Sequence, residues 1–210
     1  LADMATDPTD FDSTISDIGA IAATTLTDLA NTTTGDIVAP AVTALTGSAP
    51  AVLAVQGNAD IILVQNYNVT LEGVAQATDI TAIGAAIGTG AINGAALTAI
   101  NGTAAVVVQA LADMATDPTG FTATITGSTA TAADLNAIAL ATTVPQGVNI
   151  EQVQTVSLVD AGESFDVTNF TYGSTGFTIN GGGGNDTIIG GINDDTITAG
   201  AGNNSIDGGE

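Results

Sequence analysis

Apolar and polar residues alternate along residues 1–156 in two different periods, one typical of helices and the other typical of strands. Three Ala-rich stretches carry large apolar residues three positions apart, which places them on one face of a helix. These pairs are Leu26/Leu29, Ile80/Ile83 and Leu135/Ile138. The spacing predicts short amphipathic helices over Ala22–Ala30, Ala77–Ile87 and Ala130–Ala141, and the Thr and Asp residues near their starts fit N-caps.

Segments rich in Val, Ile and Thr lie before and after each of these helices, and they predict strands. The strands before the helices are Ser13–Ser16, Asn68–Leu71 and Thr122–Thr126, and those after them are Asp36–Leu45, Ile92–Ile100 and Val148–Val159. A Gly-Ser/Thr-Ala sequence then opens a second short helix, predicted at Pro50–Val55 and Ala104–Met114.

The predicted elements recur because the sequence itself repeats. Leu1–Thr9 is identical to Leu111–Thr119, and Leu45-Thr-Gly-Ser-Ala resembles Ile100-Asn-Gly-Thr-Ala at half that offset. We interpret residues 1–156 as about two and a half degenerate units of roughly 55 residues. A unit this small cannot bury its own apolar face, so the prediction is a stacked tandem α/β array. A generic globular region is the alternative.

The charge of the chain limits its partners. It has 210 residues, no Lys, Arg, His or Cys, and 22 acidic residues, giving a formal net charge of −22. Such a surface repels nucleic acid and anionic lipid, so we expect neither as a partner, and cations are the expected counterions. With 45% hydrophobic residues, the chain is not a disordered acidic tail.

The same composition leaves few options for catalysis or membrane insertion. A Ser/His/Asp triad and a Cys or Lys nucleophile are impossible, and we expect no enzymatic activity. Asp160, Glu163 and Asp166 lie close in sequence; we interpret them as a solvated joint or an extra calcium site rather than a hydrolase pair. Gly, Thr and Asn interrupt the apolar stretch 80–108, so membrane insertion is not expected. The chain reads as a piece of a longer protein.

The last thirty residues repeat with a strict period of nine. Gly181-Gly-Gly-Gly-Asn-Asp-Thr-Ile-Ile189 is followed by Gly190-Gly-Ile-Asn-Asp-Asp-Thr-Ile-Thr198 and by Ala199-Gly-Ala-Gly-Asn-Asn-Ser-Ile-Asp207. Glycines permit a left-handed backbone and a close approach to an ion. A Gly-rich turn with one Asp supplies the mixture of carbonyl and carboxylate oxygens that calcium prefers. A flexible linker is the alternative interpretation.

These repeats resemble the nonapeptide G-G-x-G-x-D-x-U-x of the repeats-in-toxin (RTX) family, where U is a large apolar residue. The resemblance implies a parallel β-roll around calcium, in which two nonapeptides form one coil. Turns on the same edge then lie eighteen residues apart. Asp186 is expected to share an ion with Asn204, and Asp195 with a turn beyond Glu210. The candidate calcium ligands are Gly181, Gly183, Asp186, Gly190, Ile192, Asp195, Gly200, Gly202 and Asn204.

Three features depart from this pattern. Asn193 replaces the fourth-position Gly, and Asn204 replaces the sixth-position Asp, so the Asp186/Asn204 site is expected to be weaker. The ninefold apolar register also continues backwards through Ile179 to Phe170. Those earlier coils lack the Asp, so they are predicted to be a metal-free start of the roll.

The sequence as a whole therefore predicts a tandem α/β array over 1–156 and a truncated RTX-type roll over 157–210. The resemblance implies secretion from a Gram-negative bacterium in one step, with folding triggered by external calcium. We expect a structural protein of the cell surface that assembles with its own copies into a surface layer or filament. The alternatives are an adhesin stalk, for which a cell-surface glycan is a possible partner, and the non-catalytic part of a secreted RTX toxin or enzyme.

Overall fold

The computed structural model describes residues 10–64, 66–159 and 162–210. By its internal contacts, the chain divides into two compact units. The first consists of Leu1–Ala75, Asp79–Leu97 and Asp113–Asp117, and the second of Gln76–Thr78, Thr98–Ala112 and Pro118–Glu210. The first copy of the identical repeat, Leu1–Thr9, lies outside the described residues.

The first unit is built from coils that each contain two short strands and a helix. The successive coils are β1 (Ser13–Thr14), β2 (Gly19–Ala22) and α1 (Ala23–Ala30); β3 (Ile37–Ala39), β4 (Val42–Gly47) and α2 (Ala49–Gln56); and β5 (Ile61–Leu63), β6 (Asn68–Gln76) and α3 (Ala77–Ala86). Equivalent strands pair in parallel, so that Ser13, Ile37 and Ile61 align. Leu45 aligns in the same way with Ile21 and Val69. Each coil thus stacks directly on the previous one.

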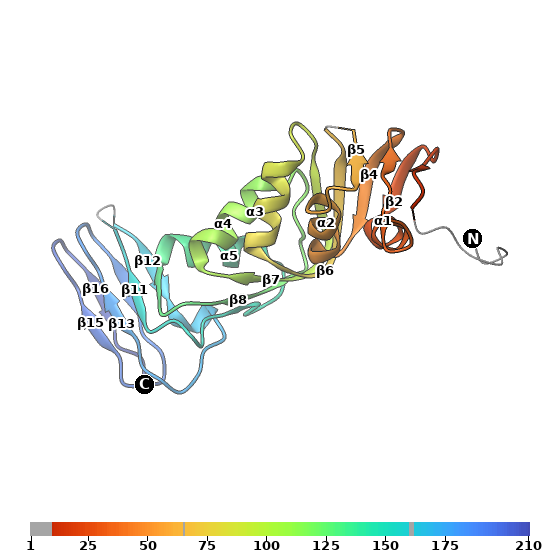
Figure 1. Cartoon of the computed structure of the whole chain (residues 1–210). Helices are drawn as coiled ribbons and strands as arrows, with labels where there is room; N and C mark the ends of the chain where they lie inside the picture. Colours follow the sequence, from red (N-terminus) through yellow and green to blue (C-terminus); the bar gives the residue numbers. More distant parts are fainter. Residues whose placement is uncertain (1–9, 65, 160–161) are drawn as a thin grey trace. The chain divides into compact units, whose positions relative to one another are not determined.

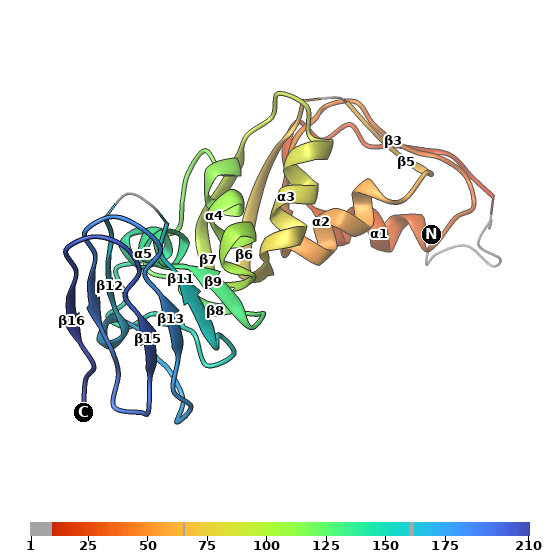
Figure 2. The same cartoon turned by 90° about the vertical axis from the view of Figure 1, so that its left-hand side faces the viewer.

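Helices α1 and α2 pack on each other and against β2 and β4, as Figure 1 shows for this unit. Figure 2 shows β3 and β5 running side by side, in agreement with their pairing. Leu26 of α1 and Val52 of α2 are fully buried, as are the facing strand residues Leu45 and Leu71. The core of the first unit is therefore a thin aliphatic layer enclosed by strands and helices, consistent with the low aromatic content.

The second unit contains the same kind of coil. Strand β7 (Ile92–Gly102), whose residues up to Leu97 belong to the first unit, is followed by α4 (Ala104–Asp113). Strands β8 (Thr122–Ile125) and β9 (Thr129–Thr131) are followed by α5 (Ala132–Ala141). Ile100 of β7 aligns with Ala123 of β8, which aligns with Val148 of β10 (Val148–Asn149). The buried residues Leu135 and Ile138 of α5 confirm the predicted apolar face.

In the next coil of this unit a strand stands where the earlier coils have a helix. Strands β10 and β11 (Thr155–Ser157) are followed by β12 (Ser164–Asp166) and a single 3-10 turn, η1 (Val167–Asn169). Asn136 of α5 donates a 2.7 Å hydrogen bond from Nδ2 to the Ser164 carbonyl of β12. From this coil onward the chain has short parallel strands on both sides, and the helical side of the solenoid ends.

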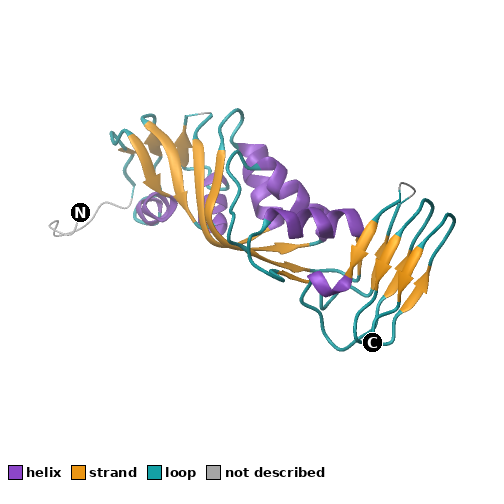
Figure 3. Ribbon diagram, turned by 180° about the vertical axis from the view of Figure 1, so that it is seen from behind, coloured by secondary structure: helices purple, strands orange, loops and turns teal. Residues whose placement is uncertain are grey.

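The last coils form a two-sided parallel roll. One sheet has the order β9, β11, β13 (Thr178–Asn180), β15 (Thr196–Thr198), and the other has the order β12, β14 (Thr187–Ile189), β16 (Ser205–Asp207). Figure 3 shows these short strands in rows with turns at both ends. Thr178 aligns with Thr196 and Thr187 with Ser205, so one coil takes eighteen residues. Two nonapeptides per coil are confirmed.

The predicted array of α/β units is also confirmed. Helices α1, α3 and α5 begin at Ala23, Ala77 and Ala132, and therefore keep the expected spacing of about 55 residues. Each predicted unit corresponds to two coils with one helix each. Two predicted strands were too long: Asp36–Leu45 is divided into β3 and β4, and Val148–Val159 into β10 and β11. In both cases the chain turns a corner of the solenoid.

Helix capping was predicted less well. At α5, Thr131 is the N-cap, and its Oγ1 accepts a 3.1 Å hydrogen bond from the Asp134 N–H. Helices α1 and α2 begin after Ala22 and Ser48, and neither residue makes a side-chain cap hydrogen bond. Helix α1 begins directly after β2 ends, and α2 begins one residue after the end of β4. The end of the parallel strand therefore fixes where each of these helices starts. The division into domains at 156/157 stays a prediction.

Candidate metal centre

The turns that follow β13 and β15 lie on the same edge of the roll and stack directly on each other. They contain residues 181–186 and 199–204, which are eighteen positions apart. Asn204 Oδ1 accepts a 2.9 Å hydrogen bond from the Asp186 N–H. Asn204 Nδ2 donates to the Ala199 carbonyl at 2.9 Å. The structure thus brings the predicted pair Asp186 and Asn204 together, and the Asn at the sixth position also holds its own turn closed.

On this edge of the roll, Asp186 is a buried carboxylate that a bound cation would stabilise. It is only 1% exposed. Its Oδ1 accepts a 2.8 Å hydrogen bond from the Glu163 N–H, whereas Oδ2 is buried with no hydrogen-bond partner among the described residues. A buried carboxylate is costly unless it is paired or bound to a metal. Because the chain contains no Lys, Arg or His, no basic side chain of the chain can pair with it.

Glycine at position 181 leaves the space that such an ion requires. A Cβ atom placed on Gly181 would collide with the Ala199 carbonyl oxygen and lie 3.2 Å from Asp186 Oδ2. The unpartnered carboxylate oxygen and a backbone carbonyl therefore face the same small space, which a side chain at 181 would fill. Within the described residues, no three carboxylates gather closely enough to hold a metal. Backbone and amide oxygens of the described turns are the further ligands available on this edge, and calcium accepts both.

The opposite edge of the roll carries the turn with Asp195. Asp195 Oδ1 accepts from the Phe177 N–H and Oδ2 from the Gly191 N–H, both at 2.7 Å. A Cβ at Gly190 would lie 2.7 Å from Asp195 Oδ2 and collide with the Gly208 carbonyl. As at Gly181, a backbone carbonyl and an Asp oxygen face the space that the glycine leaves. Both oxygens of Asp195, however, already accept hydrogen bonds. The expected sharing of an ion between Asp195 and a later turn stays a prediction.

The remaining predicted ligands lie in the same turns. Gly200 and Gly202 adopt positive φ angles of 77° and 118°, a conformation that favours glycine. Gly183 is half-buried in the Asp186 turn, and Ile192 is 69% exposed in the Asp195 turn. Asn193, which replaces a glycine, donates a 3.1 Å hydrogen bond from Nδ2 to the Gly173 carbonyl of the previous coil. That bond offers a reason for the departure from the pattern. Which of these backbone oxygens bind metal stays a prediction.

The coil before the first nonapeptide contributes a residue whose position the sequence did not reveal. Glu163 donates its N–H to Asp186, and its carboxylate accepts a hydrogen bond from the Val159 N–H. Glu163 precedes Ser164, which aligns with Thr187, so the offset here is twenty-three residues rather than eighteen. The nonapeptide period could not detect it. Asp160, the other acidic residue expected in this joint, lies outside the described residues.

The same change of offset corrects the predicted backward register. Ile179 aligns with Ile197, as expected. In the other sheet, however, Phe165 aligns with Ile188, and Phe170 follows η1 outside any strand. The prediction that Phe170 belongs to the ladder was therefore wrong. Phe170 is buried and stacks on Phe165 with ring centroids 5.4 Å apart, filling the roll where the coil is wider.

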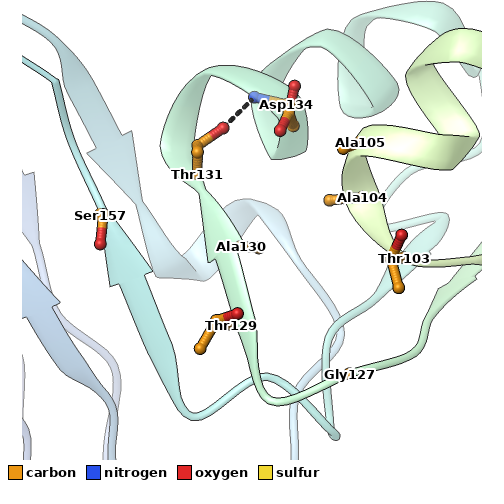
Figure 4. Close-up of a pocket in the computed structure, with 9 residues that line it drawn as sticks. All are labelled: Thr103, Ala104, Ala105, Gly127, Thr129, Ala130, Thr131, Asp134 and Ser157. Atoms are coloured by element: carbon orange, nitrogen blue, oxygen red, sulfur yellow. Dashed lines mark hydrogen bonds between the residues drawn. The ribbon is translucent and has the colours of Figure 1, made fainter.

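A separate hollow of about 400 Å³ lies between the starts of α4 and α5 and strand β11 in the second unit. Figure 4 shows hydroxyl groups of Thr103, Thr129 and Ser157 around it, with Asp134 at the start of α5. Thr131 Oγ1 accepts a hydrogen bond from the Asp134 N–H, and among the described residues Asp134 is the one carboxylate in the lining. One carboxylate near a helix N-terminus is explained by the helix dipole and offers no acid–base pair.

Comparison with known proteins agrees with the geometry of the turns. Neither a search of curated proteins nor a search of solved structures found a significant match to the chain. One family model matches residues 180–210, and its description is "RTX calcium-binding nonapeptide repeat (4 copies)". Repeats of this kind bind Ca²⁺ and are typical of secreted proteins. Among the described residues, no helix is long and apolar enough to cross a membrane.

Two observations in these turns fit a calcium ion. Asp186 Oδ2 is buried without a partner, and the absence of a side chain at Gly181 leaves space beside it. A bound calcium ion would supply the positive charge that the chain lacks. Residues 180–210 are therefore RTX calcium-binding nonapeptide repeats, arranged as coils of a parallel β-roll.

Proposed function

We propose that this chain is part of a structural, non-enzymatic protein of a bacterial cell surface. In this proposal, the protein binds calcium and assembles with its own copies into a surface layer or filament. The observation that carries the proposal is the combination of a stacked repeat fold with a surface that has acidic residues and no basic ones. Copies of such a protein repel one another unless cations lie between them.

The first unit shows how the fold concentrates this charge. Asp12, Asp36 and Asp60 precede the aligned strands β1, β3 and β5, so they occupy the same position in three successive coils. All three are exposed, and Asp12 Oδ1 accepts a 2.9 Å hydrogen bond from the Asp36 N–H. We call these three residues the acidic column.

The repulsion within this column is large enough to matter. Parallel strands lie about 4.8 Å apart. Two like charges at about 5 Å repel by roughly 1 kcal/mol in water and about 3 kcal/mol at the effective dielectric constant near a protein surface. Monovalent salt screens this repulsion without joining two molecules. A divalent ion can bind carboxylates of two copies at once, so calcium bridging explains why such a surface is compatible with assembly.

A non-catalytic role is supported by the residues available. The chain has no His, Cys, Lys or Arg, and the hollow beside α5 has a single carboxylate among the described residues of its lining. A Ser or Thr nucleophile is usually activated by an adjacent general base, most often His, and this chain has no His. The repeat architecture instead provides regular surfaces, which suit assembly.

Negative-stain electron microscopy of the purified protein tests the proposal. We expect regular assemblies in millimolar calcium and dispersed particles in chelator at equal ionic strength. The double variant Asp36→Asn/Asp60→Asn should assemble less in calcium than the control Asp17→Asn/Asp28→Asn, which removes the same charge from exposed positions outside the column. Dispersed monomers under both conditions would contradict assembly and favour an adhesin stalk, for which glycan binding would be the next measurement.

A further inference from the structure

The orientation of the Asp186 carboxylate depends on a residue outside the nonapeptides. Asp186 Oδ1 accepts a 2.8 Å hydrogen bond from the Glu163 N–H, while Oδ2 lies beside the space that Gly181 leaves. A hydrogen bond to one oxygen of a carboxylate restricts the direction of the other, because both belong to the same planar group. The Asp186 N–H is itself held by Asn204 Oδ1 at 2.9 Å. The Glu163 N–H therefore keeps Asp186 Oδ2 turned toward this space.

Glu163 is in turn held by its own side chain and carbonyl. Its carboxylate accepts a hydrogen bond from the Val159 N–H, four residues earlier. Asp195 does the same in the second nonapeptide, where Oδ2 accepts from the Gly191 N–H, also four residues earlier. The Thr187 N–H donates a 2.8 Å hydrogen bond to the Glu163 carbonyl. Glu163 thus takes the place of a sixth-position Asp, although it precedes residues 180–210, which match the family.

The residue after Glu163 is tied to helix α5. Asn136 Nδ2 donates a 2.7 Å hydrogen bond to the Ser164 carbonyl, and α5 contacts β12. Leu135 and Ile138 on either side of Asn136 are fully buried, so α5 is fixed in the core of the second unit. A continuous series of contacts therefore runs from this helix through β12 to the calcium site.

We propose that Glu163 and Asn136 are positioning residues for the calcium site at Asp186. They hold the Glu163 N–H in place, so that Asp186 Oδ2 already faces the space beside Gly181 before calcium binds. A group held in its bound orientation loses less conformational entropy on binding, so the affinity is higher. Residues that orient a metal ligand without touching the metal commonly act in this way. The inference concerns calcium binding alone and does not depend on the proposed assembly.

Two substitutions of Glu163 separate positioning from direct coordination. Glu163→Gln keeps an oxygen that can accept the Val159 N–H, Glu163→Ala removes it, and both remove the same charge. In calorimetry of the full chain with calcium, Glu163→Gln should match the exposed control Glu151→Gln. Glu163→Ala should bind roughly 2- to 10-fold more weakly, as expected for one lost hydrogen bond. If the carboxylate of Glu163 coordinated the ion, Glu163→Gln would bind as weakly as Glu163→Ala.

Thermal unfolding separates positioning from a purely structural role. A residue that only stabilises the fold should lower Tm equally in calcium and in chelator when it is replaced. Glu163→Ala should instead reduce the rise in Tm that calcium produces, because part of the binding free energy is lost.

Asn136→Ala tests the connection to α5. The substitution removes the bond to Ser164 but raises the intrinsic helix propensity at that position, so it does not weaken the helix itself. Calcium affinity should fall roughly 2- to 10-fold, whereas the exposed control Asn169→Ala should leave it unchanged. The double variant Asn136→Ala/Glu163→Ala should lose less than the product of the two single losses, because both substitutions act on the same N–H.

Four results would overturn the proposal. They are calcium binding by Glu163→Ala that is as tight as by Glu151→Gln, binding by Glu163→Gln that is as weak as by Glu163→Ala, unchanged binding by Asn136→Ala, and an equal loss of Tm for Glu163→Ala in calcium and in chelator.

Discussion

Replacing Asp186 by Asn should stabilise the roll in the absence of calcium and destabilise it, relative to the unchanged protein, in its presence. The substitution removes the negative charge and keeps the oxygen that accepts the Glu163 N–H. It also replaces the unpartnered Oδ2 by an NH₂ group that can donate to a neighbouring carbonyl. If the effect of this one substitution on stability changes sign when calcium is added, the role of the carboxylate in metal binding is separated from its role in packing.

The magnitude follows from the burial of Asp186, which is 1% exposed with one oxygen unpartnered. An unsatisfied buried polar group costs about 1–3 kcal/mol, and more if it is charged. In chelator, the variant should therefore gain at least about 1 kcal/mol, or roughly 2–4 °C in Tm for a chain of this size. Calcium at one hundred times its Kd should stabilise the unchanged site by about 2.7 kcal/mol, most of which the variant loses.

Thermal unfolding followed by circular dichroism, in calcium and in chelator at equal ionic strength, measures both signs. Asp194→Asn is the matched control, because Asp194 is exposed in the next nonapeptide and the change in net charge is the same. It should shift Tm little, and in the same direction under both conditions. Calorimetry should show calcium affinity reduced on the order of tenfold or more by Asp186→Asn, as expected when a charged ligand is lost.

The prediction would be refuted if Asp186→Asn lowered Tm equally with and without calcium. In that case the carboxylate would be acting only through its hydrogen bond to Glu163, and the unpartnered oxygen would have no part in binding. If the control Asp194→Asn behaved as Asp186→Asn does, the effect would come from net charge and not from the buried site.

Four further outcomes are expected. Gly190→Ala should abolish calcium-induced strand formation, because its Cβ would collide with the Gly208 carbonyl. Gly173→Ala, whose Cβ would lie 3.7 Å from Glu151 Cγ, should preserve it, and circular dichroism during calcium titration distinguishes the two variants. Asn204→Ala should weaken calcium binding less than Asp186→Ala in calorimetry, because the amide carries no charge. Phe165→Ala should destabilise the roll by about 3–5 kcal/mol in denaturant unfolding, since a fully buried aromatic ring is lost. Desolvation raises the pKa of Asp117 above its ordinary 3.8, so this group opposes folding as pH rises through that range. Because Asp117 is exposed, Asp117→Asn should raise Tm only slightly at pH 7, and not at all well below pH 3.8.

The nonapeptide turns were predictable because their information is local. A glycine-rich turn with one Asp and an inward Ile every nine residues defines both the ion-binding groups and the strand between turns. The pairing of turns eighteen residues apart followed once two repeats were assigned to each coil, and the alignment of Thr178 with Thr196 confirms it. The Ala-rich helices were predictable for a similar reason, since apolar residues at i and i+3 define their buried face.

Other features were decided only by contacts between coils. The strand β12 replaces a helix, and Phe165 rather than Phe170 aligns with Ile188, because this coil is five residues longer than the nonapeptide coils. The hydrogen bond from Glu163 to Asp186 depends on the same offset. No periodic signal in the sequence indicates such an insertion, since it changes which residues stack without changing their local preferences.

The spacing of residues along the chain therefore determined which segments are turns, strands and helices, and where calcium has oxygen ligands. Tertiary structure decided which residues of separate coils meet. Asp186 is buried with an unpartnered oxygen only because Glu163 and Asn204 stack on it from the neighbouring coils. Gln56 at the end of α2 donates from Nε2 to the Tyr67 hydroxyl only because the two residues, eleven positions apart, meet in space. The burial and pairing of a polar atom depend on its neighbours in space. The pattern of residues around it in the sequence does not determine those neighbours.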